Sequence, residues 1–180
     1  MLKIVQSPDP LLNQVCEPCD LNDKSLKKLA AQMERAMYAN DGVGIAAPQV
    51  GVLKRLIVID VSPEDVRDSL VLVNPEILKL DGEPETEEEG CLSCPGISVP
   101  IERKPWAQVK YYDLDGEAWI IEGDGLLGRC LQHEIDHLNG KTLFESAKPR
   151  ERIKALKAYE EARRLGAKPG QVSVSSPKVR

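Results

Sequence analysis

Apolar residues recur at helical spacing in two stretches of the chain, and each stretch predicts an amphipathic helix. Residues 25–39 carry the first apolar face, made by Leu26, Leu29, Met33, Ala36 and Met37. Asp23 or Ser25 is the candidate N-cap of this helix. Residues 124–138 carry the second apolar face, made by Leu126, Leu127, Leu131, Ile135 and Leu138. Asn139 and Gly140 follow as a C-terminal stop.

Shorter apolar or alternating runs predict strands at residues 56–60, 70–74, 97–100, 107–112 and 118–122, with further pairing around residues 77–80. Pro75 should close the strand that begins at Leu70, because proline has no N–H to give to a sheet. The sequence DLDG at residues 113–116 signals a hairpin turn. Six of the nine residues between Asp81 and Glu89 are acidic, so this stretch should begin as an exposed turn. The pattern predicts an α+β fold, in which short, mostly antiparallel β-sheets pack around the helix at residues 124–138.

The amino-acid composition of the chain changes after Ala147. Residues 150–165 predict an exposed helix whose apolar stripe is Ile153, Leu156 and Tyr159. Residues 166–180 are rich in Gly, Ser, Pro and Val with little to bury, and they predict disorder. We therefore expect one domain over residues 1–147, a basic C-terminal helix over residues 148–165 and a disordered tail over residues 166–180.

The charge of the chain is unevenly distributed. The formal net charge of −5 combines 10 Lys and Arg against 3 Asp and Glu in residues 148–180 with 14 against 26 in residues 1–147. An acidic body argues against a DNA-binding protein, whereas the basic end could contact a polyanion such as ribosomal RNA. A solvated helix would explain the same basic charges.

No apolar run approaches the roughly 20 residues that a membrane helix needs, and the N-terminal sequence meets Pro8 too soon for a signal peptide. The five cysteines are an odd number in a chain of 180 residues, which is long enough to bury a core without disulfides. These features predict a soluble protein in a reducing compartment, with free thiols.

Both histidines of the chain lie four residues apart, in the sequence QHEIDH at residues 132–137. Positions i and i+4 share one face of a helix, so His133 and His137 can bind one metal ion while Glu134 lies beside its open side. This pattern predicts a metal-dependent hydrolase. The alternative is a solvated helix with two incidental histidines.

A catalytic metal ion needs a third protein ligand, and the candidates are a carboxylate or a thiolate from residues 89–96. The pairs Cys16/Cys19 and Cys91/Cys94 look like two halves of a four-cysteine zinc site, but the 71 residues between them are far more than such sites have. A redox pair at Cys91 and Cys94 would need a thioredoxin-like βαβ context, which the sequence lacks. We expect the other cysteines to be small, partly buried side chains.

Three segments together resemble the signature motifs of the peptide deformylase family. They read GVGIAAPQ at residues 42–49, EGCLS at residues 89–93 and QHEIDHLNG at residues 132–140, in family order and over roughly residues 1–147. Members of this family remove the formyl group from N-formylmethionine at the start of newly made bacterial or organellar proteins. The resemblance implies a catalytic domain over residues 1–147, N-formylmethionyl nascent peptides as partners, and a monomer in the bacterial cytoplasm. It also implies that the basic C-terminal segment could dock on the ribosome.

The resemblance assigns the metal ligands. Cys91, His133 and His137 would hold one divalent metal ion, which would be Fe²⁺ in the cell, with Zn²⁺, Ni²⁺ or Co²⁺ also accepted. The ligand set by itself favours zinc as much as iron. A bound metal lowers the pKa of a water molecule and so supplies a nucleophile near neutral pH.

The resemblance also assigns the remaining site residues. Glu134 would be the catalytic acid/base, and Gln49 with the backbone N–H of Leu92 would bind the formyl oxygen, where negative charge develops. Exposed backbone around Gly42 and Gly44 could pair with an extended peptide. The substrate pocket would be walled by Val43, Gly44, Gly90, Leu127, Arg129 and Cys130.

The chain departs from the family pattern after Ser93. Many relatives carry one arginine a few residues later and another just after a Val-Pro pair, but residues 96–101 read GISVPI and contain neither. The loop is also shortened. The pair Glu102 and Arg103 is expected to serve one of these roles, and the partner of Asp136 is left open.

Two other functions fit part of the sequence. A zinc peptidase would need a later histidine or glutamate as third ligand; no later histidine exists, and the later glutamates lack a suitable helical context. A non-catalytic, metal-stabilised module for peptide or ribosome binding would need a fourth protein ligand to close the site. Such a module has no use for a base at Glu134.

Overall fold

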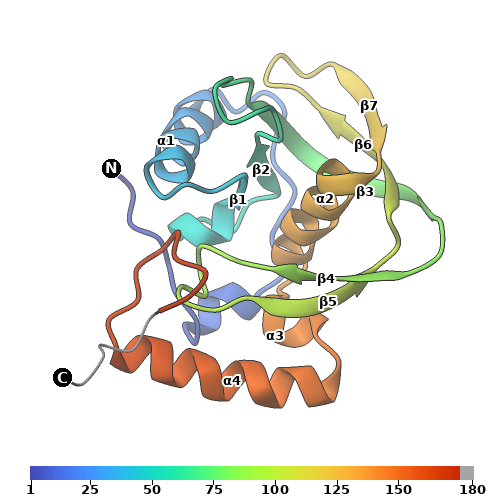
Figure 1. Ribbon diagram of the computed structural model, residues 1–180. Coiled ribbons are helices and arrows are strands. Elements are labelled where there is room, and N and C mark those ends of the chain that lie inside the picture. Colours follow the sequence, from blue (N-terminus) through green and yellow to red (C-terminus); the bar gives the residue numbers. More distant parts are fainter. Residues whose placement is uncertain (175–180) are drawn as a thin grey trace.

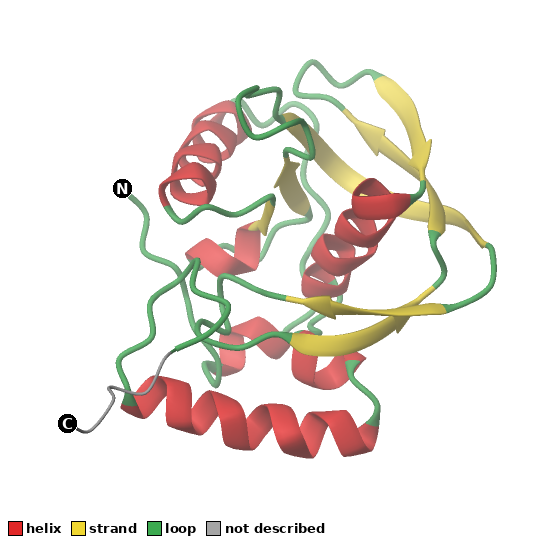
Figure 2. Cartoon of the chain, viewed as in Figure 1, coloured by secondary structure: helices red, strands yellow, loops and turns green. Residues whose placement is uncertain are grey.

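Two antiparallel sheets and four α-helices make up the part of the chain that the structure, a computed structural model, describes, residues 1–174 (Figures 1 and 2). Two single-turn 3₁₀ helices, η1 (Pro10–Asn13) and η2 (Ala47–Val50), add to these. The α-helices are α1 (Ser25–Ala39), α2 (Gly125–Leu138), α3 (Leu143–Ser146) and α4 (Pro149–Arg164). The strands are β1 (Gly44–Ala46), β2 (Leu56–Ile59), β3 (Leu70–Asp81), β4 (Glu85–Glu89), β5 (Val99–Arg103), β6 (Trp106–Tyr112) and β7 (Ala118–Gly123). The predicted α+β class is confirmed.

The larger sheet has the strand order β1-β2-β3-β6-β7, and β4 pairs only with β5 in a second sheet. The prediction that Pro75 ends the strand beginning at Leu70 is wrong, because β3 continues to Asp81. A register shift between Val73 and Glu76 accommodates the proline, which is tolerated at such an irregularity. Asn74 has a positive φ of 51°, and its side chain exchanges two hydrogen bonds with the backbone of Cys19.

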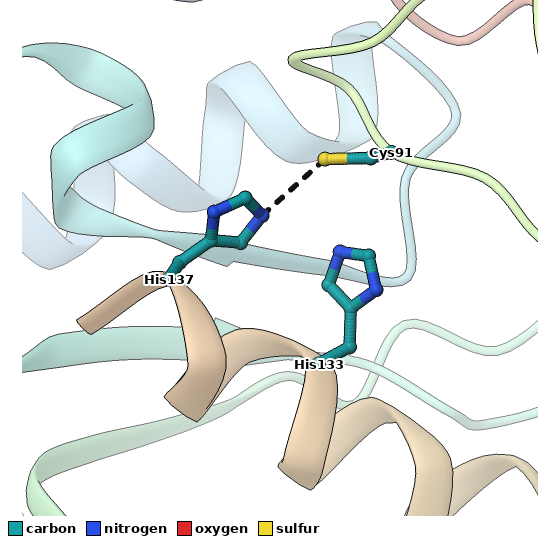
Figure 3. A group of neighbouring side chains, drawn as sticks. All are labelled: Cys91, His133 and His137. Carbon is teal, nitrogen blue, oxygen red and sulfur yellow. Dashed lines mark hydrogen bonds between the residues drawn. The ribbon is translucent and has the colours of Figure 1, made fainter. Parts of the chain in front are cut away.

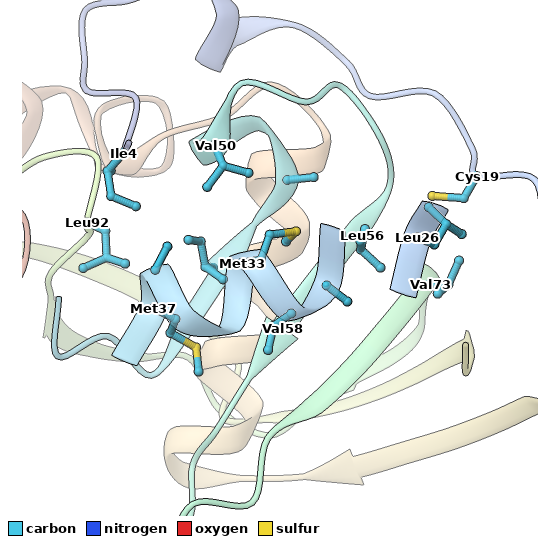
Figure 4. Close-up of a cluster of buried hydrophobic side chains, with 14 residues drawn as sticks. Ile4, Cys19, Leu26, Met33, Met37, Val50, Leu56, Val58, Val73 and Leu92 are labelled. Atoms are coloured by element: carbon cyan, nitrogen blue, oxygen red, sulfur yellow. The ribbon is translucent and has the colours of Figure 1, made fainter. Parts of the chain in front are cut away.

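The larger sheet is covered by a helix on each face, because successive side chains of a strand point to opposite sides. Along β2, Leu56 and Val58 pack with α1, whereas Ile57 and Ile59 pack with α2. Figure 4 shows the α1 side, where Met33 and Met37 lie against Val58 and neighbouring apolar side chains. This double burial explains why β2 is a continuous apolar run rather than an alternating one.

Helix α2 lies between the larger sheet and the β4-β5 hairpin (Figure 1). Its buried apolar residues Cys130, Leu131, Ile135 and Leu138 belong to the cluster shared with the sheet. Leu126, which we predicted on this face, is 54% exposed at the N-terminal end of the helix.

Helix α4 packs across β5 and α3, and with them it encloses a third apolar cluster. Its buried residues are Ala155, Tyr159 and Ala162. The predicted stripe is therefore wrong for Ile153 and Leu156, which are 58% and 48% exposed. The Tyr159 hydroxyl donates a 2.6 Å hydrogen bond to the carbonyl of Ser7, so α4 is also tied to the N-terminal segment.

The segment from Gly166 to Val174, for which the sequence predicts disorder, folds back from the end of α4 toward η2 and the turn after β4 (Figure 1). The backbone N–H of Gly96 donates a 2.7 Å hydrogen bond to the carbonyl of Gln171. The rest of the predicted tail, residues 175–180, lies outside the described residues. In the described part of the chain, no helix combines the length and the apolar character that crossing a membrane requires.

Candidate metal centre and active site

Helix α2 and the turn after β4 bring three possible metal ligands together. His133 and His137 project from one face of α2, and Cys91 approaches from the opposite side (Figure 3). The sulfur of Cys91 lies 3.3 Å from Nε2 of His137, and the donor atoms of the three residues all lie within 4.8 Å of one another. The i, i+4 spacing of the histidines therefore has the geometric effect that the sequence predicted.

The buried carboxylate of Glu89 hydrogen-bonds to the imidazole of His133 on the side that faces away from Cys91. Its Oε1 lies 3.0 Å from Nδ1 of His133, which leaves Nε2 for the ligand cluster. Arg103 binds the same carboxylate through two nitrogens, at 2.7 and 3.0 Å, and Arg129 lies 2.8 Å from it. Burial acts to raise the pKa of Glu89, but hydrogen bonds from His133 and Arg103 lower this pKa to about 2. Glu89 is therefore a permanent anion between three cationic or polar partners.

Arg103 is also the partner of Asp136, which the sequence left open. Its Nη1 lies 2.8 Å from Oδ2 of Asp136, and its side chain is buried. One guanidinium thus joins the strand that precedes Cys91 to the helix that carries both histidines. This contact gives Asp136 a partner, and the expectation that Arg103 takes over an arginine role of the family stays a prediction.

The side-chain amide of Gln49 is fixed in one orientation. Its oxygen accepts a 2.9 Å hydrogen bond from the backbone N–H of Ala46, so its Nε2 points toward Ser93 Oγ at 3.1 Å and Cys91 Sγ at 3.5 Å. Gln49 is 1% exposed. Leu92 follows Cys91 in the same turn, and its side chain belongs to the apolar cluster between α1 and the larger sheet. Both predicted oxyanion donors therefore lie next to the cysteine ligand.

Glu134 lies beside the ligand cluster and is almost completely buried. Within residues 1–174, its Oε2 and the Nδ1 of His137 are the only buried side-chain polar atoms without a hydrogen-bond partner. Burial raises the pKa of the Glu134 carboxyl to about 7, although nearby His133 opposes this shift. A carboxyl with this pKa can both accept and release a proton near neutral pH.

Gly44 is required by this packing. A Cβ atom at Gly44 would lie 2.6 Å from Oε1 of Glu134 and 2.9 Å from Sγ of Cys130, so any larger residue would displace the glutamate.

The ligand cluster opens into a cleft between β1 and β4. Of the predicted pocket residues, Val43, Gly44, Gly90, Arg129 and Cys130 line this cleft. Leu127 does not; it packs with the α2 side of the core, and neighbouring Leu126 faces the cleft instead. Gly170, Gln171 and Val172 from the C-terminal segment also line the cleft.

The donor set fits a divalent metal ion. One thiolate and two imidazoles are ligands that zinc and iron(II) accept, and three protein ligands leave a position for water. Among the described residues, no other group of histidine, cysteine or acidic side chains has this arrangement. The four-cysteine zinc site is not formed, because Cys16, Cys19 and Cys94 lie in three different apolar clusters. All five cysteines are free thiols.

Sequence reasoning missed three features of this site. Glu89 was part of a recognised motif but was given no role, although its place at the inner end of an acidic run was a signal. The bond between Gln49 and Ser93 has no signature in the sequence. The contribution of residues 170–172 was missed because the segment carries few apolar residues.

Comparison with known proteins agrees with this geometry. The family model of polypeptide deformylases matches residues 1–153. The chain belongs to the polypeptide deformylase family. A peptide deformylase of Hahella chejuensis is 42% identical over 166 residues, which cover 92% of this chain and 98% of that relative.

Solved structures of the family have the same fold. A peptide deformylase from Legionella pneumophila superposes with a TM-score of 0.85 at 42% identity, covering 92% of this chain and 96% of that one. The peptide deformylase from Synechococcus elongatus, solved in complex with actinonin, gives a TM-score of 0.81 at 38% identity and covers 89% and 85%. The chain is accordingly a metal-dependent amide hydrolase that removes the N-formyl group from newly made peptides.

Proposed function

We propose that deformylation takes place at the Cys91, His133 and His137 cluster, with Glu134 as the proton carrier. The observation that supports this most directly is the free Oε2 of Glu134, buried beside three ligand atoms that lie within 4.8 Å of one another. A divalent metal held by these ligands would supply an activated water by lowering its pKa. Cys91 would hold the metal as the thiolate, since metal coordination removes the proton of a thiol.

Gln49 and the backbone N–H of Leu92 bind the formyl oxygen. When the formyl carbon is attacked, negative charge develops on this oxygen, and donors that are already oriented stabilise it without reorganisation. The Nε2 of Gln49 is held in place because Ala46 occupies the other end of the amide. Ser93 accepts from the same Nε2 and keeps it directed at the cysteine turn.

Glu134 accepts the proton from water and passes it to the departing amine. An amine is a poor leaving group unless it is protonated, so the group that takes the first proton must also give it back. The buried position of Glu134 favours this exchange, because burial raises the pKa of its carboxyl to about 7.

The substrate lies extended in the cleft. In the described part of the chain, β1 is an edge strand of the larger sheet and β4 pairs only with β5, so each has an edge free toward the cleft. An extended peptide can hydrogen-bond to such edges through its main chain, whatever its side chains are. The methionine side chain then packs against Val43, Leu126 and Cys130.

We propose Fe²⁺ as the metal in the cell. Iron(II) next to a thiolate is sensitive to oxidation, so the iron form should lose activity in air faster than the nickel form. Metal analysis of protein purified without oxygen should give one iron per chain, and equal decay of both forms would contradict this assignment.

We propose that the protein acts as a monomer in the bacterial cytoplasm; light scattering and cell fractionation test both points. The exposed basic residues of α4, such as Lys154, Lys157 and Arg163, suit an RNA surface on the ribosome. Replacing these three by serine should weaken salt-sensitive co-sedimentation with ribosomes, and unchanged binding would contradict ribosome docking.

The deciding experiment measures formate release from formyl-Met-Ala-Ser by iron-loaded protein prepared without oxygen. A Glu134→Ala variant should retain its metal and lose nearly all activity. Absence of formate from the unmodified protein would contradict the proposal, and full activity of the variant would contradict the role of Glu134. The non-catalytic alternative predicts a fourth protein ligand, and among the described residues only three donors gather.

A further inference from the structure

The C-terminal segment at residues 168–172, here called the strap, forms part of the lining of the substrate cleft. It follows α4 and lies outside the part of the chain that matches the deformylase family model, residues 1–153. In Figure 1 it is the loop after α4 that rises toward η2 and the turn after β4.

Backbone hydrogen bonds hold the strap in shape. The N–H of Gln171 donates to the carbonyl of Lys168 at 3.1 Å, and the side-chain oxygen of Gln171 accepts from the N–H of Lys168 at 2.8 Å. The N–H of Gly96 donates to the carbonyl of Gln171 at 2.7 Å, which ties this turn to the loop after Cys91. The strap is therefore fixed at both its own turn and the catalytic loop.

The strap contacts both walls of the cleft. On the first wall, Gly170 packs against the carbonyl of Asn40 so closely that a Cβ atom would lie 2.3 Å from that oxygen. On the second wall, a Cβ atom at Gly90 would lie 2.9 Å from Cγ1 of Val172. Gly90 precedes the ligand Cys91, so Val172 contacts the residue that is next to a metal ligand in the sequence.

Val172 is the apolar element of the strap that faces the cleft. It is 58% exposed and lines the cleft together with Gly90, which its Cγ1 contacts. The formyl group must reach the Cys91 cluster, so the residue after formylmethionine must lie between that cluster and the open end of the cleft.

We propose that Val172 is a specificity-determining residue, which packs against the side chain that follows formylmethionine and favours an apolar one there. The proposal rests on the deformylase function of the same cleft. Because the strap is held through backbone atoms, a change of the Val172 side chain should alter the contact without releasing the strap. The effect should therefore appear only with substrates that have a residue at this position.

The test compares kcat/KM of the full chain, iron-loaded, on formyl-Met amide, formyl-Met-Leu-Ser and formyl-Met-Ser-Ser. For Val172→Ser, kcat/KM on formyl-Met-Leu-Ser should fall about threefold to tenfold, since losing part of an apolar contact costs less than removing a buried methylene. Activity on formyl-Met amide should not change, and Val172→Ile should keep the preference for leucine. Ile153→Ser is the matched control, because Ile153 is also 58% exposed but lies on α4 away from the cleft.

Three outcomes would overturn the proposal. One is an unchanged leucine-to-serine ratio in Val172→Ser. Another is an equal change on all three substrates, which would mean that the strap only obstructs the cleft. The third is the same loss in Ile153→Ser. Failure of the deformylase assignment would look different, because the unmodified protein would then release no formate from any of these substrates.

Discussion

Oε1 of Glu89 lies 3.0 Å from Nδ1 of His133, on the side of the imidazole that faces away from Cys91. A hydrogen bond here requires the proton on Nδ1, so it sets the tautomer in which Nε2 is free to bind a metal. The same carboxylate is bound by two buried arginines. Glu89 thus orients the ligand His133 without being a metal ligand itself.

Replacing Glu89 by glutamine should weaken metal binding about 10- to 100-fold, because the ring of His133 loses its charged partner. Competition against a chromogenic chelator measures this change. Glu88→Gln is the matched control, since Glu88 is the neighbouring glutamate of β4 and is exposed. Equal affinities of the two variants would contradict the role of Glu89, provided that circular dichroism shows both folded.

Replacing Gln49 by leucine should lower kcat on formyl-Met-Ala-Ser about 100- to 1000-fold, which is typical for loss of one oxyanion donor. Metal content should not change. Ser93→Ala should cause a smaller loss of kcat, because Ser93 contacts the amide of Gln49 rather than the substrate. A larger effect for Ser93→Ala than for Gln49→Leu would reverse these roles.

Arg103→Met should destabilise the fold by about 3–5 kcal/mol, because it removes one of the two buried arginines that bind Glu89 and the arginine that pairs with Asp136. Urea unfolding measures the free energy. Lys148→Ala breaks an exposed ion pair with Glu102 and should cost only about 0–1 kcal/mol. Similar losses of unfolding free energy in both variants would contradict the stabilising role of the buried ion-pair network.

Asp60 should make the fold sensitive to acid. Burial acts to raise its pKa, but hydrogen bonds from Ser62, Tyr38 and the backbone of Asp68 lower this pKa to about 2. The unfolded value is about 3.9, so the ionised carboxylate stabilises the fold above about pH 4, and this stabilisation is lost as the pH falls toward 2. The difference in unfolding free energy between the unmodified protein and Asp60→Asn should therefore shrink between pH 5 and pH 2. A difference that stays constant with pH would contradict this account.

Local patterns were sufficient for most elements of the fold. The helix predicted at residues 25–39 has the bounds of α1, and the DLDG turn joins β6 to β7. The three motifs also brought the ligands, Gln49 and Glu134 to one place, because each motif fixes its own local geometry.

The other features of the fold and the site depend on tertiary packing, which local sequence patterns do not reveal. Leu126 and Leu127 are adjacent on one helix, and only the position of the sheet determines which of them faces the cleft. The path of β3 past Pro75 depends on an irregularity that the sequence does not mark. The strap is held by the carbonyl of Gln171, and a backbone bond of this kind leaves no side-chain pattern to read.

The hydrogen bond from Tyr159 to Ser7 has a consequence for the order in which the molecule matures. The N–H of Ser7 donates in turn to the carbonyl of Ser93, so the first residues of the chain, the catalytic turn and the last helix are joined in one clamp. Synthesis delivers the chain from its N-terminus, and Tyr159 follows all three ligands in the sequence. A nascent copy whose Tyr159 has not yet emerged from the ribosome therefore has its ligands but not the clamp that steadies them.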